Sequence, residues 1–464
     1  MPGTIIELPY GAGTVTATVP GHLRTHTLLP PEVPAVSDGA VETARALSDP
    51  VGGTKLEQLV RSAAPDRPAE PPAAGRRHPT VAIAVNDKTR PVPHADLLPP
   101  LLRELDRCGV RRADITFIIA TGMHPVMAPA EFAAILPREI IDTCTVVCHN
   151  AHDDRSLVEL GTTSRGTPCT VNAAFAAADL RIVIGNIEPH QFMGFSGGVK
   201  GAAIGLAGAA TVNANHALMR EPGARLGRYE GNPAREDVEE LGRLIGVHFA
   251  VNAVLTQDKR IVRVFAGTPA DVMRSGIPDV LRICTVGIDE PFDAVIASPG
   301  GHPKDINIYQ SQKGLAHAVS AATASAPVVL AAACPEGTGS THYEEWVSER
   351  SGHDDVLGDF EKMPFTVGPH KAFQIARDAS GRQLRLVTGM SEHAVERLLL
   401  TRSRSLQGAV DEIIAPLPDG SRVAVIPRAN VTIPFVGSAS AGDARTGAPG
   451  TDGKKEGGFQ GDGW

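Results

Sequence analysis

Residues 185–216 read GNIEPHQFMGFSGGVKGAAIGLAGAATVNANH, and they directly follow a short apolar run, LRIVI, at positions 180–184. Such a run is typical of a strand that is buried in a parallel sheet. The residues behind it, among them His190 and Lys200, would stand at the carboxyl end of that strand. Open α/β sheets bind their ligands at this end. We therefore expect the functional site here.

A glycine-containing loop precedes Lys200 and consists of Ser196, Gly197, Gly198 and Val199. Glycines let backbone N–H groups approach an anion, so the loop is predicted to bind one. Its spacing is not that of a Walker loop, and no nucleoside triphosphate site is expected. An Ala/Gly-rich helix should follow, with His216 near its far end.

Composition limits the class of protein. The chain has 464 residues, 42% of them hydrophobic, and a formal net charge of −8. This length predicts two domains, and the acidic balance argues against nucleic-acid binding. The first residues form no signal peptide and no stretch suits a membrane span, so we expect a cytoplasmic protein without membrane partners. The six cysteines are expected to be small buried residues; the spacing of Cys144, Cys148 and His149 does not suit one metal ion.

Three predicted strands end in polar residues. Strands at 80–85, 115–120 and 180–184 lead to Arg90, His124 and His190, respectively, and predicted helices separate them. Alternating strands and helices favour a doubly wound parallel sheet, in which these side chains converge at one edge.

The predicted fold class is α/β, with two domains that each have a mostly parallel sheet flanked by helices. We place the boundary near 275–278. Residues 1–276 would form the catalytic and cofactor-binding domain, with a flexible insert at 63–79. Residues 277–436 would contribute substrate-binding residues, and residues 437–464 would be a disordered tail. The active site would lie in the cleft between the domains.

The candidate residues suit acid–base work on an anionic substrate. Taken singly, a histidine is more often structural and a lysine more often solvated. Together they form a set: Arg90 and Lys313 as cations for a carboxylate, His124 and His190 as proton carriers, Lys200 as a covalent anchor, and His216 as a metal ligand. Two bases that flank one substrate are what a racemase needs. The residues alone do not identify the bond that is broken.

Five motifs, in order along the chain, resemble those of the nickel-dependent lactate racemase family. The resemblance runs from about residue 8 to about residue 377. The motifs are DKTRP at 87–91, TGMH at 121–124, PHQFMGFSGGVK at 189–200, NH at 215–216 and YQSQK at 309–313.

The resemblance implies a racemase or epimerase of a 2-hydroxy acid that uses a nickel pincer nucleotide (a pyridinium-3-thioamide-5-thiocarboxylate mononucleotide). Lys200 would hold this cofactor covalently, and His216 would bind the nickel. Hydride transfer to the cofactor and proton exchange with His124 and His190 would pass through a 2-keto acid. The resemblance further implies these binding residues: Arg90, Tyr309, Gln310 and Lys313 for the substrate carboxylate, and Asp87, Ser196, Gly197 and Gly198 for the cofactor. The expected partners are a 2-hydroxy acid and the enzymes that synthesise the cofactor.

Several positions depart from the family pattern. Pro125 and Val199 stand where the family often has arginine, and residues 201–206 lack the usual proline. The segment GPHKAF at 368–373 stands where lactate enzymes are expected to carry a tryptophan, and its His–Lys pair favours a larger or more polar substrate, such as a hydroxy diacid or sugar acid. Two alternatives stay open: a non-catalytic cofactor carrier or sensor, and an NAD-type dehydrogenase, although no G-x-G-x-x-G opens a helix after an early strand.

Overall fold

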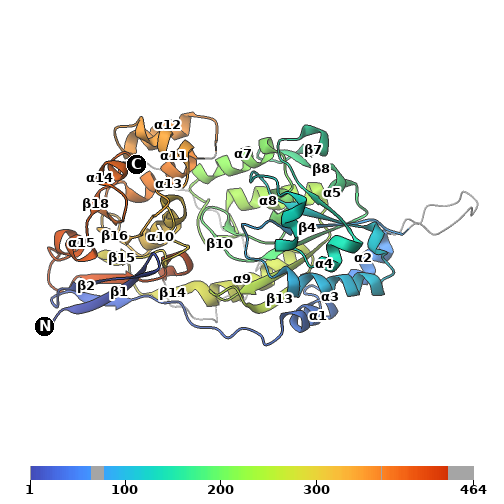
Figure 1. Cartoon of the computed structure of the whole chain (residues 1–464), viewed down its shortest axis with the longest axis horizontal. Coiled ribbons are helices and arrows are strands. Elements are labelled where there is room, and N and C mark those ends of the chain that lie inside the picture. Colours follow the sequence, from blue (N-terminus) through green and yellow to red (C-terminus); the bar gives the residue numbers. More distant parts are fainter. Residues whose placement is uncertain (1, 64–77, 367, 437–464) are drawn as a thin grey trace, which may run out of the picture.

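The structure is a computed structural model that describes residues 2–63, 78–366 and 368–436. The expected tail at 437–464 lies outside the described residues, and so does the expected insert at 63–79 apart from its ends. Two bodies lie side by side, and each is built around a six-stranded sheet (Figure 1). The predicted α/β class with two mostly parallel sheets is confirmed.

The first sheet consists mainly of parallel strands whose residues are almost all buried. Only β13 runs antiparallel, against β12. In spatial order the strands are β13 (Ile261–Gly267), β12 (Phe249–Leu255), β9 (Leu180–Asn186), β4 (Val81–Asn86), β5 (Ile115–Ala120) and β6 (Thr145–Cys148).

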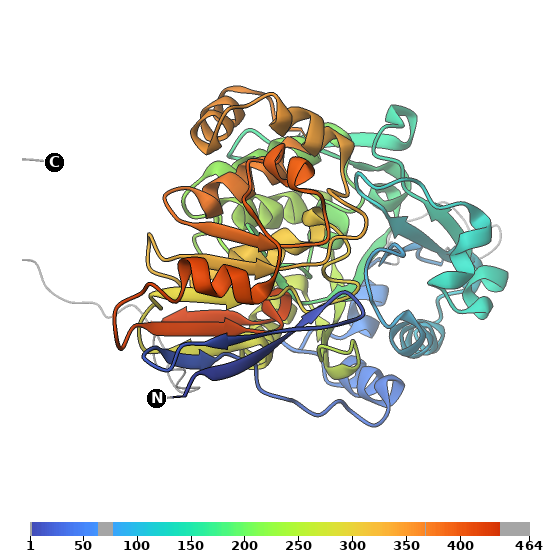
Figure 2. The ribbon, with the colours of Figure 1, turned by 60° about the vertical axis from the view of Figure 1, so that its left-hand side comes forward.

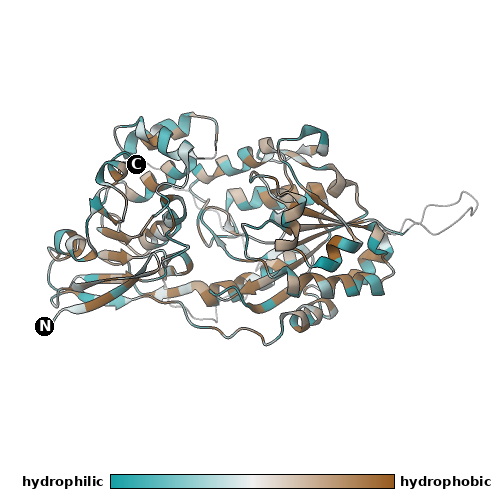
Figure 3. Cartoon of the chain, viewed as in Figure 1, coloured by the Kyte–Doolittle hydropathy of each residue, from teal (hydrophilic) through white to brown (hydrophobic). Residues whose placement is uncertain are grey.

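Helices pack on both faces of the first sheet, as continuous apolar strands require. One face carries Ile83 and Phe117 and packs against α1 (Gly39–Ser48), α2 (Leu56–Ala63) and α3 (His94–Arg107). The other face packs against a second group of elements. This group comprises α5 (Ala173–Ala177), α6 (Lys200–Ala203), α7 (Ala209–Ala217), α8 (Pro233–Ile245) and α9 (Pro269–Cys284). The short helix α4 (Arg138–Thr143) precedes β6. In Figure 3 the strands of this sheet are largely brown, which marks them as hydrophobic.

The second sheet is parallel throughout. Its strands, in spatial order, are β18 (Arg402–Ser403), β17 (Leu384–Val387), β16 (Val328–Ala331), β15 (Ala294–Ala297), β19 (Arg422–Ile426) and β3 (Arg24–Thr27). One face packs against α10 (Ile308–Ser320), α11 (Thr341–Ser348), α12 (His353–Lys362), α13 (Pro369–Ala379) and α14 (Glu392–Glu396). The other face packs against α15 (Leu406–Ile413) and a hairpin of β1 (Thr4–Tyr10) and β2 (Gly13–Val19).

The first three strands of the chain pack in the second body, together with the last elements of the chain. Strand β3 pairs with β19, and the β1–β2 hairpin packs beside α15, as Figure 2 shows for the dark-blue and red elements. The expectation that residues 1–276 form one unit is therefore wrong for the first strands. The half-exposed pattern of these residues predicts an edge hairpin. The hairpin is confirmed, but β1 and β2 form a separate two-stranded sheet that packs on one face of the second sheet and pairs with neither of its edges.

The predicted boundary at 275–278 falls inside α9 and is also wrong. Buried residues recur along this helix from Val272 through Gly276 to Val280, so its apolar face continues past Pro278. Strand β14 (Thr285–Ile288) follows α9 and pairs with β20 (Ile433–Val436), which ties the connection to the second body.

Two further small ladders complete the fold. They are β7 (Leu157–Thr162) with β8 (Pro168–Asn172), and β10 (Pro189–His190) with β11 (Gly194–Phe195). Across the part of the chain that the structure describes, none of the helices has the length and apolarity needed to cross a membrane.

Candidate active site

Three neighbouring strands deliver the polar residues predicted for the edge of the first sheet. Strands β9, β4 and β5 lie side by side and run parallel. Arg90 follows β4, His124 follows β5, and His190 follows β9. The prediction that these residues share one sheet edge is confirmed.

His124 is paired with Asp87, which the sequence had suggested as a cofactor-binding residue. The Nδ1 atom of His124 lies 2.7 Å from Oδ2 of Asp87, and the hydroxyl of Thr89 donates to Oδ1 at 2.7 Å. Burial alone would raise the pKa of Asp87, but the hydrogen bonds from His124 and Thr89 hold it below its usual range. The carboxylate therefore stays charged and keeps the proton of neutral His124 on Nδ1, which leaves Nε2 as a base.

His190 has the complementary arrangement. It lies in β10, and its Nδ1 accepts a hydrogen bond from the backbone N–H of Met193 at 3.3 Å. Burial, together with the positive charges of Lys200 and Arg90, lowers the pKa of His190 well below its ordinary value. The neutral ring thus carries its proton on Nε2, so that His190 presents a donor where His124 presents an acceptor.

Two backbone N–H groups of the predicted anion-binding loop already donate hydrogen bonds to other parts of the protein. The N–H of Ser196 donates to the carbonyl of Glu188 at 2.8 Å, and the N–H of Gly198 donates to Oδ1 of Asn252 at 2.7 Å. Gly197 and Gly198 have φ of +89° and +57°, and a Cβ on Gly198 would lie 2.7 Å from Met273. The glycines are therefore required by backbone conformation and close packing, and the N–H groups of Ser196 and Gly198 are not available to an anion.

A buried arginine holds this loop in place, and sequence reasoning missed it. Arg235 of α8 is 1% exposed. Its guanidinium donates to the carbonyls of Phe195 (3.0 Å) and Gly197 (3.2 Å) and to Glu239 (2.9 Å from Nε). Its place in an amphipathic helix, remote in sequence from the loop, gave no signal of this contact.

Lys200 begins α6 directly after the loop and is half-buried. Burial, and then the charges of Arg90 and Arg235, lower its pKa to about 7, although Glu188 opposes the shift. A large part of this amine is therefore neutral at neutral pH, and a neutral amine is a nucleophile.

The single helix expected after Lys200 is instead two short helices. Helix α6 ends at Ala203 and α7 begins at Ala209. The turn between them is tight at Gly205, where a Cβ would lie 2.4 Å from the carbonyl oxygen of Gly201. His216 does lie near the end of α7, as predicted. Burial and the charge of Lys200 lower its pKa to about 3, so the ring is neutral and able to bind a metal.

No group of three or more His, Cys, Asp or Glu residues that could hold a metal ion occurs among the described residues. A metal on His216 would therefore take its other ligands from a bound molecule. Neutral His216 and nucleophilic Lys200 together fit a cofactor that brings its own metal donors and is anchored by an amine.

The second body contributes α10 to the same region. Tyr309 and Lys313 are half-buried on this helix, and Gln310 uses its backbone N–H to complete the cap of Asn307 at 3.0 Å. Burial and the charge of Arg90 lower the pKa of Lys313 to about 8. Burial raises the pKa of Tyr309, although Arg90 opposes this shift. The guanidinium of Arg90 has no ion-pair partner within the described part of the chain.

Glu188 lies two positions before His190 and contributes a carboxylate to this region, but the sequence did not mark it as a candidate site residue. Its carboxylate is 3.8 Å from Lys259. Burial would raise its pKa, but Lys259, Arg90 and the nearby lysines 313 and 200 hold it below its ordinary value. One carboxylate thus faces several cations, so the site has an excess of positive charge that suits anionic ligands.

Direct contacts join the two bodies beside His190. The side chain of Gln191 donates to Oε1 of Gln312 at 2.9 Å, and Lys371 of α13 donates to both glutamine oxygens. The sequence had named Lys371 only as part of a polar pair. Its contact with Gln191 depends on how the two bodies pack, which no local pattern encodes.

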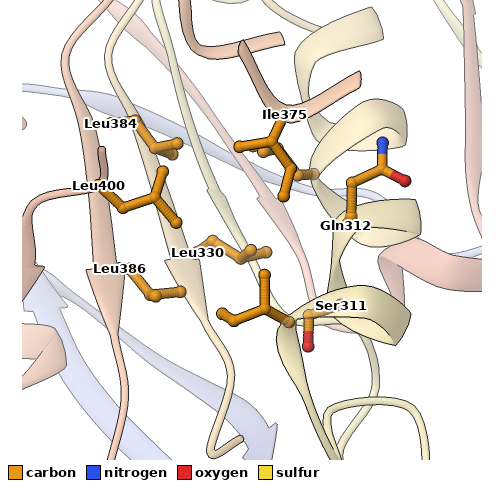
Figure 4. A pocket seen from close by; sticks show the side chains of 9 residues that line it. Ser311, Gln312, Leu330, Ile375, Leu384, Leu386 and Leu400 are labelled. Carbon is orange, nitrogen blue, oxygen red and sulfur yellow. The ribbon is translucent and has the colours of Figure 1, made fainter. Parts of the chain in front are cut away.

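The far side of α10 is closed by apolar packing. A void of ≈10 Å³ there is lined mostly by leucine and isoleucine, and Figure 4 shows the amide of Gln312 turned away from these side chains. This volume holds about one water molecule, so the void is no substrate site. The polar end of Gln312 instead faces Gln191 and Lys371.

The structure is thus an α/β fold that brings Lys200, whose pKa is lowered, and the histidines 124, 190 and 216 to one region at the sheet edge. Residues 10–227 match the family model for the lactate racemase N-terminal domain, and residues 289–433 match that for the lactate racemase C-terminal domain. The chain belongs to the lactate racemase family, whose named members are isomerases that act on a hydroxy acid.

Two relatives show how far the similarity extends. The lactate racemase of Thermoanaerobacterium thermosaccharolyticum is 29% identical over 434 residues, which are 91% of this chain and 97% of that protein. The lactate racemase of Lactiplantibacillus plantarum is 33% identical over 346 residues, which are 72% of this chain and 76% of that protein. The structure of the Thermoanaerobacterium apoprotein superposes with a TM-score of 0.82 at 28% identity and covers 93% of this chain and 100% of that one.

Proposed function

We propose that this protein racemises or epimerises a 2-hydroxy acid, with a nickel pincer nucleotide bound between Lys200 and His216. The observation that carries the proposal is a pair of histidines whose hydrogen bonds favour opposite neutral tautomers, at one sheet edge with a lysine whose pKa is lowered to about 7. When bound, the cofactor would supply a reversible acceptor for the hydride on Cα of the substrate. The two relatives described above are named lactate racemases, which supports racemisation as the reaction class.

The residues present fit this cofactor. Lys200 supplies an amine that is partly neutral near pH 7, as covalent attachment requires. His216 supplies one neutral nitrogen donor, and a pincer brings the remaining donors itself. Ser196 and Gly198 already donate their N–H groups within the protein. We therefore assign the cofactor phosphate to the cations that surround Glu188 rather than to this loop.

His124 and His190 would exchange the hydroxyl proton of the substrate. His124 accepts it on Nε2, and the Asp87 carboxylate at Nδ1 stabilises the resulting imidazolium. His190 must gain a proton to act as the acid, and the nearby cations oppose this. Anionic substrate and cofactor would weaken that positive potential, so we expect ligand binding to raise the pKa of His190.

The substrate carboxylate would be held by Arg90 and Lys313, with Tyr309 and Gln310 beside them. Arg90 offers a planar fork that suits a carboxylate and is free of ion pairs to other described residues. These residues come from both bodies, so we propose that the site lies between them. The cofactor would reach the chain from its biosynthetic enzymes, which are its proposed partners.

The test is the appearance of the second enantiomer. Cofactor-loaded protein is incubated with one enantiomer of a 2-hydroxy acid, and chiral chromatography follows the other. We expect His124→Ala to lower kcat by about 10²–10⁴-fold while the protein still carries cofactor. His152→Ala, an exposed histidine, is the control and should match the wild type. If loaded wild type produces no second enantiomer, or if His124→Ala is fully active, the proposal is wrong.

A further inference from the structure

Lys371 is a buried lysine without a counter-ion. It lies on α13 and is 4% exposed. Its Nζ donates to Oε1 of Gln191 at 3.3 Å and to Oε1 of Gln312 at 3.1 Å, and it lies 4.7 Å from the centre of the Tyr309 ring. In the described chain it forms no ion pair with a carboxylate. Lysines are seldom buried unless they are paired, so an anion bound here would stabilise the charged form of Lys371.

The carboxylate whose charge acts most on Lys371 is already in use. Asp378 accepts from Nε of Arg377 at 2.9 Å and from Nε2 of Gln312 at 3.3 Å, and Gln312 stands between it and the lysine. The amide therefore separates the two charges and turns its oxygen toward Lys371. Two glutamine oxygens and an aromatic face can orient an ammonium group, but they do not neutralise it.

The position of Lys371 relates it to the substrate more than to the cofactor anchor. Its contact Gln191 is next to His190 in the sequence, and Tyr309 belongs to the expected carboxylate-binding set. After burial, the charges that act on Lys371 are those of Lys313, Asp378 and Arg377, and that of Lys200 is not among them.

A single substrate carboxylate would not pair with all three cations Arg90, Lys313 and Lys371. Arg90 and Lys313 are enough to bind the carboxylate next to the reacting hydroxyl of the substrate, so Lys371 remains without an anionic partner. We infer that Lys371 binds a second anionic group at the far end of the substrate, so that the enzyme prefers a 2-hydroxy diacid to a 2-hydroxy monoacid. This inference rests on the proposed function and names its substrate class.

Turnover of two probe substrates tests the inference. The kcat/KM of the cofactor-loaded enzyme is measured with malate, a 2-hydroxy diacid, and with lactate, a monoacid. A charge-assisted hydrogen bond predicts a preference for malate of about 10-fold or more. Lys371→Gln should lower kcat/KM for malate by about 10–100-fold, chiefly through KM, and change that for lactate less than about 3-fold. Lys362→Gln, an exposed lysine on α12, is the matched control and should change neither.

The outcomes separate the two proposals. If wild type racemises neither acid, the proposed function fails. If it racemises lactate as well as malate, or if Lys371→Gln lowers both rates equally, the function stands and the inference about Lys371 is wrong. Lys371→Met is made in parallel, because an apolar side chain of similar length removes the buried charge and, unlike glutamine, adds no new polar group; both variants remove the lysine donor from Gln191 and Gln312.

A binding measurement gives a readout without turnover. Succinate and propionate resemble the two kinds of substrate but lack the reacting hydroxyl. We expect succinate to raise the Tm of loaded wild type more than propionate at equal concentration, and we expect Lys371→Gln and Lys371→Met to abolish this difference. An equal shift with both acids, or an undiminished succinate effect in both variants, would overturn the inference.

Discussion

Lys200 and Lys371 are two amines whose pKa is lowered to about 7 mainly by burial, yet their surroundings differ. Arg90 and Arg235 add to the shift at Lys200, which follows a tightly packed loop. Lys371 is surrounded by neutral hydrogen-bond acceptors. Burial thus favours a neutral, nucleophilic amine at Lys200, whereas at Lys371 a bound anion would restore the charged form that burial disfavours.

The depressed pKa of Lys200 predicts its reactivity. Burial and nearby cations disfavour the charged amine, so Lys200 loses its proton as pH rises through about 7, and about nine-tenths of it is neutral at pH 8. We expect acetic anhydride to label Lys200 of cofactor-free protein half-maximally near pH 7, as read by peptide mass spectrometry. Exposed Lys362 on α12 serves as the internal reference for the extent of labelling. Identical pH profiles for the two lysines would contradict the account.

Individual site residues were largely predictable from the sequence where they follow a strand. His124, His190 and Arg90 come directly after buried apolar runs, and the parallel sheet brings such positions together. Glu188 and Gln191 flank His190 but gave no signal of their own, because their partners Lys259 and Lys371 are distant in sequence. The pairing of Asp87 with His124 was missed for the same reason.

At the scale of elements, the loop before Lys200 depends on α8. The structure places Lys200 directly after the loop, at the start of α6, but the N–H groups of Ser196 and Gly198, which were expected to bind an anion, donate within the protein. Their protein partners lie in other elements, Asn252 in β12 among them, and a motif read in isolation does not reveal them. The loop is a rigid support, with Arg235 fixing two of its carbonyls.

Removing this arginine should be costly. Arg235→Met removes the buried ion-pair partner of Glu239, which keeps a hydrogen bond from the Tyr229 hydroxyl, and removes the guanidinium donor to the carbonyls of Phe195 and Gly197, so we expect a loss of about 3 kcal/mol in the free energy of unfolding. Urea denaturation measures the loss, and Arg243→Met, an exposed arginine on the same helix, should cost far less. Because the charge of Arg235 lowers the pKa of Lys200, the labelling midpoint of Lys200 should also move to higher pH. Unchanged stability together with an unchanged midpoint would show that Arg235 does not support the loop.

At the scale of the whole molecule, alternating strands and helices were enough to predict two parallel sheets. They were not enough to assign the first strands, since β3 joins the second sheet through pairing with β19, almost 400 positions away in sequence. The predicted boundary failed because α9 keeps its buried face on both sides of Pro278. Both errors concern long-range pairing and packing, and neither affects the strand ends that carry the site.

We interpret the two bodies together as the binding site of a metal-carrying cofactor, which Lys200 and His216 would hold. The most direct measurement is intact mass together with metal analysis, on protein produced alongside the cofactor-synthesis enzymes. We predict a mass increment that maps to Lys200, near-stoichiometric nickel, and no adduct on Lys200→Ala. His216→Ala should keep the adduct and lose nickel. Absence of both adduct and nickel from the wild type would contradict the account.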